Sequence, residues 1–429
     1  MESESARSLW WQTAAPSPPT ARLERDVTVE VAIVGGGFSG LTAILHLAGR
    51  GRSVAVFEAE HLGAGASGLN GGFVVPNFSK ADPATTIRRL GEAKGRALLA
   101  LVARGAERVF ETIAANGIDC DAEQNGWLQP AHSKLADDTA SARAEFWQSL
   151  GRPVTHVSGD DVRRMTGVSD YRGALFDRSG GTIQPLSYLR GLARAAIDRG
   201  ATVYEQTPVM GAELRNGSWL LDCGGHTVKA ETVLLCTNAG GVGLARRLGR
   251  AIVPLQVYQI ATEPLSADTV RRFSPDRIPL SDMRANLFTY RLDRENRLIS
   301  GGMTILPVAA HRRLARDIVE RLARGLNLER VPQVDFVWRG TAAMTRDFLP
   351  HLYEFGPGFF GAIGCNGRGI AMTAMLGEVL ADAATGVPLD ALPVPTAAAR
   401  AIPLRPLAGA VASAALVHAR WQDWRSGNA

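Results

Sequence analysis

Three glycines with a fixed spacing, Gly35, Gly37 and Gly40, are the residues of this 429-residue chain whose pattern most clearly implies chemistry. They form a GxGxxG motif between an apolar stretch at 31–34, which predicts a buried strand, and a helical pattern at 41–49. In such a unit the glycines allow a tight turn, the approach of a pyrophosphate to the backbone, and close packing of helix on strand. The free N–H groups at the helix N-terminus favour phosphate binding.

An acidic side chain stands where a dinucleotide-binding fold needs one. Residues 52–57 predict a second buried strand, and Glu58, followed by Ala59, comes directly after it. An acid about 20 residues beyond the glycines accepts hydrogen bonds from ribose hydroxyls and disfavours a 2′-phosphate. An ordinary βαβ unit with a glycine turn is the alternative, but all five features follow in the order that a dinucleotide site requires.

A second glycine-rich stretch, residues 63–73, follows this acid. Its glycine content argues against a regular element and for a loop that passes close to a flat or charged group. Because of its position we expect it to border the rest of a long dinucleotide, with a flexible surface loop as the alternative. The contact residues expected in it are Gly65, Ala66, Ser67, Asn70, Gly71 and Gly72.

Together these motifs resemble those of a known family. GGGFSG at 35–40, Glu58 and GASGLNGG at 65–72 are similar to motifs of the FAD-dependent amine and amino-acid oxidoreductases, which include D-amino-acid oxidase, glycine oxidase and sarcosine oxidase. The gamma-glutamylputrescine-oxidising branch, which the chain resembles in particular, has arginine where this chain has Leu69, so the substrate stays open. The resemblance implies an α/β fold with a Rossmann-like, glutathione-reductase-like FAD-binding domain and a discontinuous substrate domain of sheet and helices.

Further cofactor contacts follow from the resemblance. The family's valine whose backbone contacts the adenine corresponds to Val209, and its small polar turn beside the diphosphate corresponds to 237–239. A glycine turn and helix at 358–384 would meet the flavin, where the helix dipole stabilises a reduced anionic ring; a surface turn is the alternative. The remaining expected FAD contacts are Phe38, Ser39, Val209, Thr237, Asn238, Ala239, Gly364, Asn366, Gly367, Arg368, Gly369 and Ile370.

The same resemblance implies the reaction. A hydride passes from the carbon beside a neutral amine to the flavin, the imine hydrolyses to a carbonyl compound, and the electrons go to oxygen or a carrier. The cofactor supplies this chemistry, which suits a sequence without a catalytic triad, an HExxH motif or a metal cluster. Non-covalent FAD is expected, because residues 345–347 match the Thr-Pro-Asp of covalent sarcosine oxidases only in part, and Cys365 is the nearest cysteine.

The substrate side is expected on the strands of a second region, residues 251–339, which also contains an amphipathic helix. A sheet backed by a helix beside a dinucleotide domain is typical of a substrate domain. Inward residues of its strands could cover the flavin, with ordinary core packing as the alternative. The catalytic candidates are Tyr258, Tyr290, Trp338 and Arg368, where a solvated arginine is the alternative for the last.

Composition and charge argue against several other classes. The net charge is +5, but the basic residues are scattered without interleaved aromatics, which argues against nucleic-acid binding. The four cysteines lack metal-ligand spacing and predict unpaired thiols in a reducing, cytoplasmic compartment. No apolar run reaches the ~18 residues of a membrane-spanning helix, and no metal site is expected.

The expected organisation is discontinuous. Residues 1–27 form an N-terminal lead in which 9–11 packs on the surface, with a partner site as the alternative. The chain is expected to be a monomer or a homodimer. The predicted segments are 28–85, 155–250 and 340–390 for the FAD-binding domain, 86–154 and 251–339 for the substrate domain, and 391–429 for a C-terminal tail.

Four competing functions are weighed against amine oxidation. A flavin monooxygenase would carry a Gly-Asp turn near the C-terminal ribityl site, and a reductase with its own nicotinamide domain would carry a second GxGxxG; neither motif is present. A flavin subunit of a multi-component dehydrogenase would use the tryptophan-rich termini to dock its partner. A non-catalytic dinucleotide sensor is disfavoured because the chain keeps every flavin loop.

Overall fold

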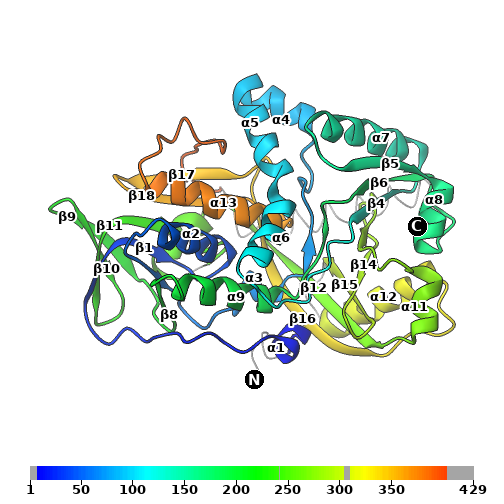
Figure 1. Ribbon diagram of the computed structural model, residues 1–429, viewed down its shortest axis with the longest axis horizontal. Coiled ribbons are helices and arrows are strands. Elements are labelled where there is room, and N and C mark those ends of the chain that lie inside the picture. The colour runs from blue at the N-terminus through cyan, green and yellow to red at the C-terminus, as the bar shows by residue number, and fades with distance from the viewer. Residues whose placement is uncertain (1–6, 241, 304–309, 403–429) are drawn as a thin grey trace.

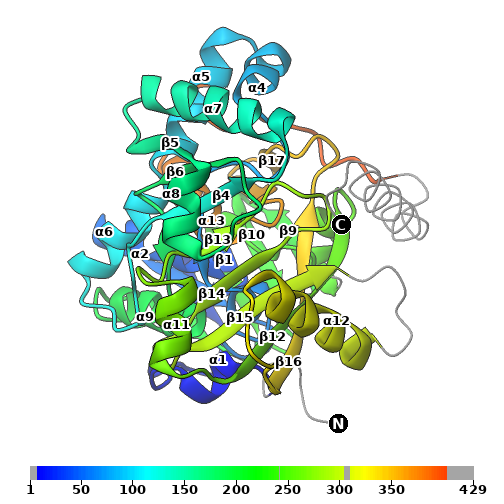
Figure 2. The ribbon, with the colours of Figure 1, turned by 90° about the vertical axis from the view of Figure 1, so that its right-hand side faces the viewer.

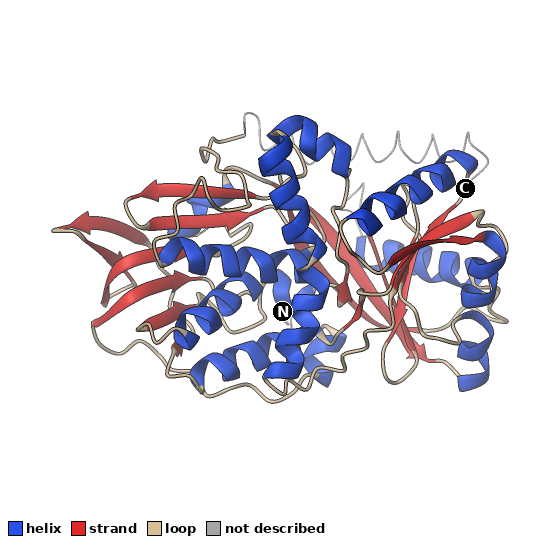
Figure 3. Cartoon of the chain, turned by 45° about the horizontal axis from the view of Figure 1, so that its top comes forward, coloured by secondary structure: helices blue, strands red, loops and turns tan. Residues whose placement is uncertain are grey.

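The structure is a computed structural model, which describes residues 7–240, 242–303 and 310–402. Two eight-stranded sheets dominate the molecule and lie toward its opposite ends, with helices packed against both (Figures 1 and 3). A small two-stranded sheet, β3 (Phe73–Val74) with β7 (Gly181–Thr182), completes the pairing. The α/β class predicted from the sequence is confirmed.

The first sheet is built around the predicted strand–turn–helix unit. β1 (Val27–Val34) pairs in parallel with β2 (Val54–Phe57) on one side and β11 (Thr227–Leu235) on the other. The carboxyl half of β1 and all of β2 are buried, as expected for parallel strands covered on both faces. The remaining strands are β8 (Thr202–Tyr204) beside β2, then β18 (Phe359–Ile363), β17 (His351–Gly356), β10 (Ser218–Asp222) and β9 (Gly211–Arg215) on the β11 side.

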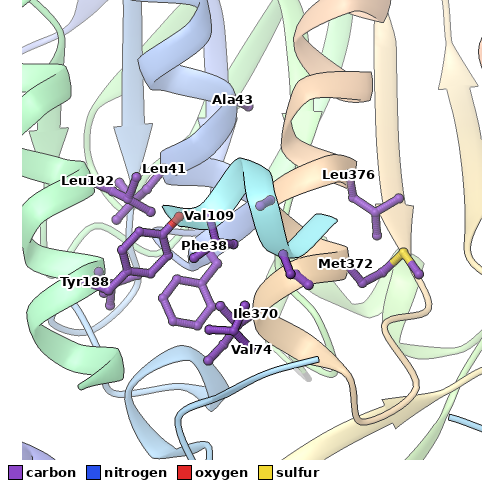
Figure 4. Close-up of a cluster of buried hydrophobic side chains, with 14 of the residues drawn as sticks. Phe38, Leu41, Ala43, Val74, Val109, Tyr188, Leu192, Ile370, Met372 and Leu376 are labelled. Carbon is purple, nitrogen blue, oxygen red and sulfur yellow. The ribbon is translucent and has the colours of Figure 1, made fainter. Parts of the chain in front are cut away.

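Three helices pack together against this sheet: α2 (Phe38–Gly49), α9 (Pro185–Ile197) and α13 (Gly369–Ala384). Their apolar side chains, among them Phe38, Tyr188 and Ile370, form one buried cluster (Figure 4). β1, β11 and β18 run in the same direction, and α2 and α13 directly follow β1 and β18. Both helices therefore begin at the carboxyl edge of the sheet.

The second sheet has the order β16-β12-β15-β14-β13-β4-β6-β5 and is antiparallel except between β13 and β4. Helix α12 (Ala310–Gly325) packs on β12, β15 and β16 (Figure 2). Its apolar side, including Leu314, Ile318 and Leu322, is buried. The strands are β16 (Val334–Met344), β12 (Val253–Pro264), β15 (Arg297–Met303), β14 (Thr289–Leu292), β13 (Leu280–Ser281), β4 (Trp127–Ala131), β6 (Gly173–Asp177) and β5 (Val154–Ser158).

Further helices pack around these two layers. α6 packs on α13, whereas α7 packs on β4, β5 and β6. The remaining elements are α1 (Leu9–Thr13), α3 (Ala66–Leu69), α4 (Pro83–Leu90), α5 (Glu92–Ala103), α6 (Gly105–Ala115), α7 (Lys134–Ser149), α8 (Gly159–Thr166), the 3-10 turn Gly243–Ala245, α10 (Arg246–Gly249) and α11 (Ala267–Phe273).

The strand pairing crosses the predicted division of the chain at two places, and the division itself stays a prediction. β6 pairs with β4 on one side and with β5 on the other in the second sheet, whereas 155–250 was expected in the FAD-binding domain. β16 continues in the second sheet to Met344, past the predicted boundary at 340. Strands that lie far apart in the sequence pair because they satisfy each other's backbone hydrogen bonds. No local sequence pattern reveals which strands will pair.

The N-terminal lead also differs from its prediction. Leu9 and Trp10 are each only 1% exposed, so this segment is part of the core and does not merely lie on the surface. α1 lies at the base of the molecule where the two sheets approach each other, beside β16 (Figure 1). The predicted tail beyond residue 402 lies outside the described residues.

Candidate active site

A cavity of about 420 Å³ lies at the carboxyl edge of the first sheet and is bordered by both sheets. In open parallel sheets this edge is where ligands bind, and the volume lies in the range of small-molecule sites. The motifs recognised in the sequence border one side. The second sheet contributes Val257, Gln259, Gly340, Thr341 and Ala342 from β12 and β16.

The first glycine turn has the backbone that its motif predicts. Gly35 has φ +105°, and a Cβ there would lie 2.8 Å from the carbonyl oxygen of Cys236. A Cβ at Gly40 would lie 2.1 Å from the carbonyl oxygen of Gly35, so α2 can pack this close only with glycine. Gly37 is the N-cap of α2 and makes no side-chain cap hydrogen bond, which leaves the helix N-terminus facing the cavity.

Glu58 borders the cavity at the end of β2. Its carboxylate accepts hydrogen bonds from the backbone N–H of Gly36 at 2.7 Å and of Glu60 at 3.0 Å. Burial raises the pKa of the Glu58 carboxyl above its usual value, although these two backbone bonds oppose the shift. An acceptor held in this way is suited to the hydroxyls of a ribose.

The second glycine-rich loop is tied to the first. Ser67 Oγ accepts a hydrogen bond from the backbone N–H of Phe38 at 3.0 Å, which joins α3 to the start of α2. Asn70 holds its own loop, because its Oδ1 accepts from the N–H of Gly72 at 2.9 Å and its Nδ2 donates to the Ser67 carbonyl at 2.8 Å. Leu69, at the position of the family's arginine, is 7% exposed and borders the cavity.

The glycine turn before α13 faces the same cavity. Gly364 has φ +115°, and a Cβ there would meet the Leu349 carbonyl at 2.6 Å. Gly367 and Gly369 border the cavity, and a Cβ at either would meet no atom within 4 Å. Asn366 points elsewhere: it shapes the turn by accepting from the Thr345 N–H at 2.8 Å and donating to the Gly364 carbonyl at 2.8 Å.

Most of the predicted cofactor contacts meet at this cavity, and six do not border it. These six are Gly40, Gly72, Ala239, Asn366, Arg368 and Ile370. The predicted contacts that border it are Gly35, Gly37, Phe38, Ser39, Glu58, Ala59, Gly65, Ala66, Ser67, Asn70, Gly71, Val209, Thr237, Asn238, Gly364, Gly367 and Gly369.

Tyr258 and Tyr290 do not face the cavity. Both belong to the apolar cluster beneath α12, where Tyr258 packs edge-on against His311 and Tyr290 against Phe273 and Phe288. Successive side chains of a strand point to opposite faces, so it is Val257 and Gln259 of β12 that border the cavity. The alternation of apolar Tyr258 and Ile260 with polar Gln259 is the sequence signal that could have identified Gln259.

Trp338 and Arg368 are the other two catalytic candidates. Trp338 is fully buried, does not border the cavity, and donates through Nε1 to the Leu69 carbonyl at 3.1 Å, so it supports the loop from behind. Arg368 is partly buried, with its guanidinium carbon 5.1 Å from the centre of the Trp127 ring. Burial, and then the nearby Arg143, lower the pKa of Arg368 to about 10.

The residues present fit a flavin dinucleotide. Two helices of 12 and 16 residues, α2 and α13, begin at the cavity without a side-chain cap, which leaves backbone N–H groups for anionic groups of a ligand. Glu58, the acid predicted to bind a ribose, borders the same cavity. Within the described ranges, no group of three or more His, Cys, Asp or Glu side chains could hold a metal ion. None of the helices described there is long and apolar enough to cross a membrane.

Known proteins are similar to this chain in sequence and in fold. The family described as FAD dependent oxidoreductase (DAO) matches residues 30–383. Gamma-glutamylputrescine oxidoreductase of Escherichia coli is 29% identical over 385 residues, which cover 89% of this chain and 90% of that protein. Glycine oxidase of Geobacillus kaustophilus is 28% identical over 364 residues, covering 82% and 92%. The structure of L-proline dehydrogenase from P. horikoshii has the same fold, with a TM-score of 0.72 at 19% identity and coverage of 86% and 96%.

Proposed function

The chain belongs to the family of FAD-dependent oxidoreductases, and we propose that it oxidises a carbon–nitrogen bond in a small amine or amino acid. FAD supplies the redox chemistry when bound, as the acceptor of a hydride from the carbon beside the nitrogen. The family depends on FAD, which is the cofactor predicted from the motifs. Relatives that align with most of the chain carry names of enzymes that act on amines and amino acids, which supports this reaction class.

The observation that carries the proposal is a single cavity with cofactor motifs on one side and the second sheet on the other. In the proposed complex, Glu58 holds the ribose, the N-terminus of α2 holds the diphosphate, and the N-terminus of α13 lies beside the flavin. Val257, Gln259 and Thr341 then cover the substrate and exclude water from the reacting carbon.

Arg368 supports a substrate that carries an anionic group. It lies between Gly367 and Gly369, which both border the cavity. In the described part of the chain its guanidinium stacks on Trp127 but has no hydrogen-bond acceptor and no carboxylate partner. A partly buried cation without a counter-ion is stabilised by an anionic ligand, so we assign Arg368 to the carboxylate or other acidic group of the substrate.

Anaerobic mixing with a panel of compounds tests the reaction class. The purified holoenzyme is mixed with glycine, proline, gamma-glutamylputrescine and further amines, and the visible absorbance of the flavin is followed. We expect bleaching by an amine and no bleaching by its matched hydroxy analogue, in which a hydroxyl replaces the nitrogen. Bleaching by a reduced nicotinamide alone would show that the reductase or monooxygenase class is correct instead.

The same experiment identifies the electron acceptor. After bleaching, air is readmitted: rapid return of the colour shows an oxidase, and persistent bleaching that an artificial carrier relieves shows a dehydrogenase.

Four cysteines without a disulfide support a cytoplasmic location for the enzyme.

A further inference from the structure

Three backbone carbonyls of the glycine-rich loop accept hydrogen bonds from side chains of other segments. The carbonyl of Leu69 accepts from Trp338 Nε1 at 3.1 Å, and that of Asn70 accepts from Trp10 Nε1 at 2.6 Å. The carbonyl of Gly72 accepts from Arg291 Nη1 at 3.0 Å. Leu69, Asn70 and Gly71 border the cavity with their other side, so these three donors set the position of the cavity wall.

The three donor side chains also contact one another, with Trp10 in the middle. The Trp10 and Trp338 rings meet edge to face, with centroids 5.8 Å apart and an interplanar angle of 75°. The guanidinium carbon of Arg291 lies 5.4 Å from the centre of the Trp10 ring. All three side chains are at most 2% exposed. Trp10 therefore joins the donors of β14 and β16 into one buried unit.

The N-terminal segment that carries Trp10 is itself fixed to the first sheet. Gln184, the N-cap of α9, donates to the Trp10 carbonyl at 2.9 Å, and Ser187 Oγ accepts from the N–H of Ala15 at 2.9 Å. Arg190 of the same helix donates to the Ala15 carbonyl at 2.6 Å. The segment thus connects α9, which packs on the first sheet, with the second sheet, and the loop lies between them.

We propose that the N-terminal segment 8–15 fixes the cavity wall formed by residues 69–71, and that Trp10 is the positioning residue through which it acts. This segment lies before residue 30, where the match to the family begins. Removing the Trp10 N–H leaves the partly buried Asn70 carbonyl without this donor and allows the wall to shift. The expected consequence is weaker binding of FAD and a changed environment of its ring.

Trp10→Phe tests this role, because phenylalanine keeps an aromatic ring and removes the N–H. We expect the dissociation constant of FAD, measured by flavin fluorescence on the apoprotein, to rise about ten-fold or more. The visible circular dichroism of bound FAD should change as well. Trp11→Phe is the matched control: Trp11 is on the same helix, is 36% exposed, and its ring packs on His61 and Arg190, contacts that a phenylalanine ring can keep. Both readouts should therefore stay at the wild-type values.

Equal FAD affinity and an unchanged flavin spectrum in Trp10→Phe would overturn the proposal, even if that variant unfolds at a lower temperature. A measurement on the wild-type protein covers the case in which Trp10→Phe does not fold. Hydrogen–deuterium exchange is compared in the presence and absence of FAD, and peptides covering 8–15 and 66–73 should gain protection together. Protection of 66–73 without any change in 8–15 would also refute the coupling.

Discussion

Gly40→Ala places a methyl group where α2 crosses the first glycine turn. A Cβ at Gly40 would lie 2.1 Å from the Gly35 carbonyl oxygen and 3.3 Å from Ile33 Cγ2, whereas ordinary contact begins at 3.4 Å. The start of α2 must therefore move away from the turn by about 1 Å in a close-packed interior. Overpacking of this kind costs about 1–3 kcal/mol in the free energy of unfolding.

The same movement takes the N-terminus of α2 away from the proposed diphosphate position, so FAD affinity should fall together with stability. Urea unfolding of the apoprotein and fluorescence titration with FAD measure the two effects. Gly49→Ala is the matched control, because Gly49 ends the same helix, is exposed, and a Cβ there would meet nothing within 4 Å. That substitution should be neutral or stabilising by up to about 1 kcal/mol. If both variants unfold alike and bind FAD alike, the close approach at Gly40 does not matter and the reasoning is wrong.

Two further predictions concern the ligand contacts proposed for Glu58 and Arg368. Glu58→Gln should raise the dissociation constant of FAD about ten-fold, because a charge-assisted hydrogen bond to the ribose is lost. Burial raises the pKa of Glu58, so wild-type affinity should fall as the pH decreases through that raised value, while the affinity of Glu58→Gln stays flat; parallel profiles would contradict the assignment. Arg368→Gln should raise KM for an anionic amine roughly 10- to 100-fold and leave KM for the corresponding amide unchanged. Equal effects on both substrates would show that Arg368 does not bind the anionic group.

Local motifs made the cofactor side of the site predictable. Gly35, Gly40 and Glu58 belong to one strand–turn–helix–strand unit in which short-range sterics decide the backbone, so their spacing was sufficient. The apolar periodicity likewise predicted the amphipathic helix that the structure shows as α12. Each of these features is encoded by residues that lie close together in the sequence.

The residues on the substrate side of the site could not be identified without knowing which face of β12 turns toward the cavity. Tyr258 was a reasonable candidate by residue type, but α12 covers its face of β12 and leaves Gln259 on the face toward the cavity. The residue type alone does not reveal this, because a strand presents two faces and the packing of a distant helix selects one of them.

The sequence by itself determined the α/β class, the family and the dinucleotide motifs, because each is encoded in a short continuous pattern. Only the tertiary structure placed β5 and β6 in the second sheet and brought Trp10 to the carbonyl of Asn70, 60 residues further along the chain. Such contacts form because buried carbonyls and aromatic rings must find partners wherever the fold brings them together. The local sequence around either partner contains no record of the other.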